Sequence, residues 1–108
     1  MNDNLSRVAF GNGRFVAGSP YLDYVLISED GLTWTRKEGI TAGALAFGGG
    51  EFLAHSRGTD RVWVSEDGMA WWEERLPRPV SLSAFAYGES SRRWVGVGSG
   101  GTILTARR

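Results

Sequence analysis

The segment Ser28-Glu29-Asp30-Gly31-Leu32-Thr33-Trp34 returns 37 residues later as Ser65-Glu66-Asp67-Gly68-Met69-Ala70-Trp71. The match extends upstream, because Ala9-Phe10-Gly11 recurs at the same interval as Ala46-Phe47-Gly48. A fixed period near 40 residues, with strand-like segments between the motifs, is typical of repeat architectures. We therefore treat the chain as successive copies of one structural unit.

A third copy begins at Ala86-Tyr87-Gly88, at a slightly longer interval than the one between the first two copies. Aligning this copy on its aromatic strands places Thr105 where the motif serine stands and Arg107 at the position of the motif aspartate. The third copy is therefore expected to lack both the Asp-Gly turn and the tryptophan-bearing strand that follows it.

Short runs rich in Val, Ile, Phe, Tyr and Trp alternate with Gly, Asn, Asp and Pro, which predicts β-strands joined by turns. No window has a helical stripe, and 16 glycines disfavour long helices. The expected strands are 5–10, 14–18, 24–28 and 33–37, then 43–47, 51–55, 61–65 and 70–75, then 82–87, 93–97 and 102–106. The predicted fold class is therefore all-β, with antiparallel strands in a 4+4+3 pattern.

Four-stranded units of about 40 residues are typical of β-propeller blades. We expect a single domain over 1–108, as a partial propeller of about three blades. The first blade should span about 5–41, the second about 42–80 and the incomplete third about 81–108.

The repeated motif resembles the Asp-box of BNR or sialidase-type β-propellers; the first copy matches its pattern fully, and the second departs from that pattern only at Ala70. The pattern around the motif is similar to that of non-enzymatic bacterial members. In that family the motif hairpin joins the third and fourth strands of a blade, on the face opposite the usual ligand site. We expect the aspartates to accept backbone N–H groups, the glycines to adopt positive φ and the tryptophans to be buried between blades. The structural motif residues are Ser28, Asp30, Gly31, Trp34, Ser65, Asp67, Gly68 and Trp71.

No catalytic constellation is evident in the chain. Sialidases use three arginines, a tyrosine nucleophile, a glutamate and an acidic proton donor, and no wider motif here assigns these roles. We therefore predict no catalytic residue and no enzymatic activity. A lone histidine also makes a poor transition-metal site, so neither a metal nor a cofactor is expected.

The composition limits the kinds of partner that are expected for the chain. Lys plus Arg number 12 and Asp plus Glu number 12, so the zero net charge does not indicate a nucleic-acid partner. There is no cysteine, which excludes disulfides. Neither a signal peptide nor a membrane-spanning segment is evident, so no membrane partner is expected. This predicts a cytoplasmic protein, unless the chain is an excised fragment.

A ligand site, if the chain has one, is expected on the loops between the second and third strands of each blade and from the fourth strand into the next blade. These loops should gather on one face. Aromatic, polar and charged side chains there suit a glycan or a peptide, and the alternative is a solvated loop surface. The candidate ligand-binding residues are Tyr21, Asp23, His55, Arg57 and Asp60.

Fewer than three complete blades do not close a propeller ring, since natural propellers typically have 4–8 blades. Three explanations remain open. Identical chains complete the ring, with a homodimer of six blades preferred over a homotrimer of nine; or the chain is a fragment of a longer propeller, such as a sialidase-like glycan-processing enzyme; or a different chain completes it. The leading function is a non-enzymatic scaffold or binding module.

Overall fold

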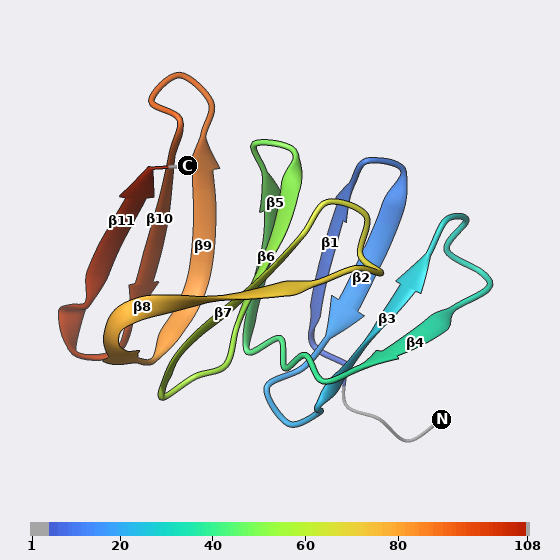
Figure 1. Ribbon diagram of the computed structural model, residues 1–108, viewed down its shortest axis with the longest axis horizontal. Coiled ribbons are helices and arrows are strands. Elements are labelled where there is room, and N and C mark those ends of the chain that lie inside the picture. Colours follow the sequence, from blue (N-terminus) through green and yellow to red (C-terminus); the bar gives the residue numbers. More distant parts are fainter. Residues whose placement is uncertain (1–4, 108) are drawn as a thin grey trace.

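The computed structural model describes residues 5–107, which form three separate antiparallel sheets (Figure 1). Sheet 1 contains β1 (Arg7–Gly11), β2 (Arg14–Gly18), β3 (Tyr24–Ser28) and β4 (Thr35–Glu38). Sheet 2 contains β5 (Ala44–Gly48), β6 (Glu51–His55), β7 (Thr59–Ser65) and β8 (Trp72–Val80). Sheet 3 contains β9 (Leu82–Gly88), β10 (Arg93–Gly98) and β11 (Ile103–Arg107), with the 3-10 turn η1 (Ser99–Gly101) before β11. The predicted all-β fold and its 4+4+3 strand pattern are confirmed.

The sheets lie side by side in chain order, and the series is not closed (Figure 1). Each strand pairs with the next one along the chain. The first strands of the sheets are neighbours in space, because β5 contacts both β1 and β9. The outer strands are β4, β8 and β11. The arrangement is that of consecutive blades of an open, partial propeller.

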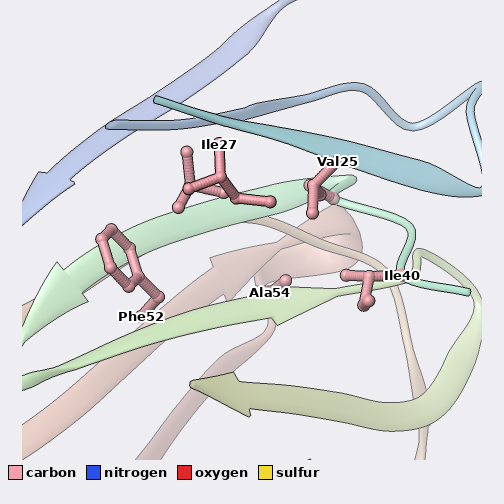
Figure 2. Close-up of a cluster of buried hydrophobic side chains, with 7 residues drawn as sticks. Val25, Ile27, Ile40, Phe52 and Ala54 are labelled. Atoms are coloured by element: carbon pink, nitrogen blue, oxygen red, sulfur yellow. The ribbon is translucent and has the colours of Figure 1, made fainter. Parts of the chain in front are cut away.

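Successive side chains of a strand point to opposite faces, so each sheet has two faces. We call the face directed towards the preceding sheet the front face and the one directed towards the following sheet the back face. The back face of sheet 1 and the front face of sheet 2 enclose the first hydrophobic cluster (Figure 2). Its buried members are Val16, Val25, Ile27, Ile40, Ala42, Phe52 and Ala54.

The back face of sheet 2 and the front face of sheet 3 enclose the second cluster. Leu53, Val62 and Val64 pack there against Trp94 of β10. Burial of apolar surface stabilises such contacts by roughly 25 cal/mol per Å². The two interfaces are therefore built in the same sense, from the back face of one sheet and the front face of the next.

The second interface contains a cleft of about 320 Å³. In sheet 2, Ala54 pairs with Trp63, whereas the corresponding pair in sheet 3 is Gly96 and Leu104. The smaller side chains leave the space open. The indole N–H of Trp94, whose ring lines the cleft, is buried without a hydrogen-bond partner among the described residues.

Two details of the sequence alignment are wrong. Strand β8 was expected to end near residue 75, yet it runs to Val80 through Pro77 and Pro79. A bulge makes this possible, because the pairing with β7 moves from Arg75 directly to Val80 and so leaves both prolines outside the hydrogen-bonded ladder.

The third copy is also displaced by one residue from the expected alignment. Trp94 lies opposite Ala106, as Phe52 lies opposite Ser65 in sheet 2. Ala106, and not Thr105, therefore takes the place of the motif serine.

Candidate functional site

The first Asp-box forms a tight turn between β3 and β4 that is held by its own side chains. The Asp30 carboxylate accepts hydrogen bonds from the N–H groups of Leu32 and Thr33, at 2.8 and 2.9 Å. The Ser28 hydroxyl donates to Asp30 at 3.0 Å and accepts from the N–H of Gly31 at 2.7 Å. Gly31 has a φ of 78°, and the backbone would be strained in this conformation if the residue carried a side chain.

The second Asp-box repeats this geometry between β7 and β8. Asp67 accepts the N–H groups of Met69 and Ala70 at 2.8 and 3.0 Å, and Ser65 accepts the N–H of Gly68 at 2.8 Å. The backbone N–H bonds hold the pKa of both aspartates below the ordinary value of 3.8. Both carboxylates are committed to turn formation, in agreement with the structural role expected of them.

The lowered pKa values predict a contribution to stability that depends on pH. A carboxylate with a lowered folded-state pKa stabilises the fold above about pH 4, and this stabilisation is lost as the pH falls through the folded-state pKa. Urea unfolding of the wild type and of an Asp30→Asn/Asp67→Asn variant should therefore give stabilities that differ at pH 6 and converge towards pH 2. Parallel stability curves between these pH values would contradict this assignment.

The two motif tryptophans occupy different environments. Trp71 packs against the first hydrophobic cluster and donates its indole N–H to the carbonyl of Gly68 at 2.6 Å. Trp34 is 39% exposed and contacts the ring of Phe15, at a centroid distance of 6.5 Å, on the front face of sheet 1. The expected burial between blades is therefore wrong for Trp34 in the single chain, because no sheet precedes sheet 1 among the described residues.

His55, a candidate ligand contact at the end of the predicted strand 51–55, does not lie on a surface open to a ligand. Its side chain is fully buried at the end of β6. Nδ1 lies 3.0 Å from the carbonyl oxygen of Arg61 and Nε2 lies 2.9 Å from that of Val80. A neutral imidazole donates to one of these carbonyls and an imidazolium donates to both. His55 therefore fastens β6 to β7 and to the end of β8, and it is closed to a ligand.

The β2–β3 and β6–β7 connections lie at one end of the sheets, the lower edge in Figure 1. Tyr21 is 82% exposed in the β2–β3 connection, where its N–H binds the hydroxyl of buried Ser19. Asp23 is exposed in the same connection, and Arg57 is exposed in the β6–β7 connection. Asp60 instead belongs to β7 and forms an ion pair with Arg75 at 3.1 Å. Tyr21, Asp23 and Arg57 therefore remain available on this loop face, whereas Asp60 has a partner within its sheet.

The two ends of the sheet series present apolar side chains to solvent. On the front face of sheet 1, Phe10 is 56% exposed and Val8 is also exposed. On the back face of sheet 3, Ile103 is 68% exposed and Val97 is also exposed. Scattered apolar residues are ordinary on protein surfaces, whereas contiguous apolar patches are typical of interaction surfaces or of aggregation-prone ones.

Residues 5–107 contain no cluster of three or more histidine or acidic side chains that could hold a metal ion. The same part of the chain has no helix long and apolar enough to cross a bilayer.

No protein-family model matches the chain, and no curated protein sequence matches it. Among solved structures, the crystal structure of the computationally designed Ika4 protein is similar, with a TM-score of 0.50 and 10% sequence identity. The match covers 99% of this chain and 92% of that chain. Over nearly its whole length the chain is therefore similar in fold to a protein of designed sequence.

Proposed function

We propose that this protein is a non-enzymatic β-propeller scaffold whose ring is completed by identical chains. The observation that carries the proposal is the pair of exposed apolar faces at the two ends of the sheet series, marked by Phe10 and Ile103. Within the chain, the same kinds of face are covered wherever one sheet follows another. Covering the two end faces would remove further apolar surface from water.

A second copy of the chain is the partner that fits these faces best. Each internal interface joins a back face to a front face, and each chain has one uncovered face of each kind. Such a head-to-tail contact is heterologous, and it gives a closed ring when the rotation per copy permits closure. Two copies would give six sheets and three copies nine, and six lies within the usual range for propellers. The zero net charge adds no overall repulsion between copies.

Absolute mass in solution, measured by size-exclusion chromatography with light scattering, tests the scaffold proposal. We expect one species at twice the chain mass of 11.8 kDa, or at three times that mass as the second choice. A monomer that unfolds cooperatively would refute the ring. A heterogeneous, aggregating sample would also count against it and would favour the alternative, a fragment of a larger Asp-box propeller.

We further propose that the loop face of this scaffold carries a ligand, either a glycan or a peptide. The exposed ring of Tyr21 offers an apolar stacking surface, and Asp23 and Arg57 offer polar contacts of both signs. A glycan array followed by a fluorogenic sialoside assay should give binding without turnover. Tyr21→Ala should reduce that binding, with Leu32→Ala, which removes an exposed side chain from an Asp-box hairpin, as the control. Turnover by the purified chain would overthrow the non-enzymatic assignment.

A further inference from the structure

The innermost strands contain a repeated contact between an aromatic ring and a glycine. Strands β1, β5 and β9 end in Phe10-Gly11, Phe47-Gly48 and Tyr87-Gly88. The ring of Phe47 covers Gly11 so closely that a Cβ atom on this glycine would lie 2.2 Å from the ring. Each internal interface therefore places an aromatic side chain where the preceding sheet has no side chain.

The second interface repeats this contact. Tyr87 covers Gly48, and a Cβ atom there would lie 2.3 Å from the Cβ of Tyr87. Real Cβ atoms do not approach this closely, so glycine is required at both covered positions if the sheets are to pack as they do.

One aromatic residue and one glycine of this series are left unmatched. Gly88 is exposed, and a Cβ atom there would meet only Ser91 and Arg93 of its own hairpin among the described residues. Phe10 is the exposed aromatic residue at the other end, where its closest ring neighbour is Phe15 of the same sheet, at 4.6 Å.

Apolar side chains near Gly88 and Phe10 are also uncovered, although the equivalent residues at the internal interfaces are covered. Ile103 of sheet 3 corresponds to Val62 of sheet 2, because each pairs with the matching residue of the second strand. Val62 is buried by sheet 3, whereas Ile103 is uncovered. At the opposite end, Val8 corresponds to Leu45, which packs into the first cluster.

We infer that Phe10 of one copy docks on Gly88 of the preceding copy in the ring, as Phe47 docks on Gly11 and Tyr87 docks on Gly48 within the chain. This inference rests on the proposed ring and adds the contact and its direction. The occupant is a second copy because the unmatched ring and the unmatched glycine belong to one repeated series. Gly88 provides the space that the Phe10 ring would occupy. A side chain at this position would keep sheet 3 of one copy and sheet 1 of the other from packing closely.

The test combines two substitutions at opposite ends of the chain. Phe10→Ala removes the aromatic ring of the contact, and Gly88→Val fills the space that this ring would occupy. Each substitution should weaken association by roughly 10-fold to 100-fold. Light scattering over a concentration series should show both variants dissociating where the wild type remains assembled. Tyr21→Ala, which removes an even more exposed ring from the loop face, should leave the mass unchanged. Circular dichroism should show unchanged folding of all three variants.

Mixing the two variants tests the direction of the contact. Phe10→Ala retains an intact Gly88 and Gly88→Val retains an intact Phe10. A closed 1:1 pair of the two variants therefore has one contact with both residues intact and one contact that carries both substitutions. The equimolar mixture should associate more tightly than either variant alone, in which every contact carries a substitution. A mixture that associates no more tightly than the separate variants, or a loss of association in Phe10→Ala without one in Gly88→Val, would overturn head-to-tail docking. If the wild type is oligomeric and neither substitution changes its mass, this inference fails while the scaffold proposal stands. If the wild type is monomeric, both fail.

Discussion

Replacing Phe52 with alanine should lower the free energy of unfolding by about 3–5 kcal/mol, the usual cost of removing a fully buried aromatic ring. Phe52 is fully buried in the interface between sheets 1 and 2 and packs edge-on against Phe47, with ring centroids 4.8 Å apart. Since small domains have total stabilities of about 5–15 kcal/mol, this loss should be evident in urea unfolding followed by tryptophan fluorescence.

Phe15 provides the matched control, because it occupies the same place in the first repeat. Its ring is only partly buried, on the uncovered front face of sheet 1. In separated chains, Phe15→Ala should therefore cost clearly less than Phe52→Ala. If the two substitutions lowered the free energy of unfolding equally, the interface between sheets 1 and 2 would stabilise the fold no more than an uncovered sheet face does. This result would contradict the assignment of Phe52 to the core.

His55→Ala should be the second strongly destabilising substitution, with an expected cost of about 2–4 kcal/mol. The imidazole bridges the carbonyls of Arg61 and Val80, and its ring also packs edge-on against Phe85 at a centroid distance of 6.3 Å. Its removal would leave buried acceptors without their donor and open a cavity at the junction of sheets 2 and 3.

Two further substitutions separate the causes of this loss. His55→Phe keeps an aromatic ring but removes both nitrogens, so it should recover the packing contribution and not the hydrogen bonds. Arg57→Ala, two residues along the chain on the exposed β6–β7 connection, should change stability by no more than about 0.5 kcal/mol. Equal unfolding midpoints for His55→Ala and Arg57→Ala would contradict the structural role of the histidine.

The strand order and most strand positions could be predicted from the sequence, because turn residues and β-branched or aromatic runs recur at a fixed interval. The Asp-box hydrogen bonds were also predictable, since they form within a few residues of the chain. Both the strand pattern and the Asp-box turns depend on residues that are close together in the sequence. The first two copies share these residues, which is why Asp30 and Asp67 have equivalent hydrogen-bond partners.

The errors concern contacts that depend on distant parts of the chain. His55 stands where the first copy has Gly18, and one of its acceptors, Val80, becomes available only through the bulge that contains Pro77 and Pro79. Trp34 and Trp71 follow the same Asp-Gly turn, but within residues 5–107 only Trp71 has a preceding sheet to pack against. Burial of a repeat residue is therefore decided by its place in the series as well as by its motif.

The outer strands differ in how well they resist unwanted pairing with other chains. Strand β4 reads Thr-Arg-Lys-Glu, and β8 carries charged residues and two prolines, which are the usual protections of a sheet edge. Strand β11 has neither charge nor proline between Ile103 and Ala106, and no strand covers its outer edge within residues 5–107. Its unpaired backbone groups form a template for intermolecular β-sheet. Among the outer strands, β11 should therefore contribute most to aggregation by strand pairing at high concentration.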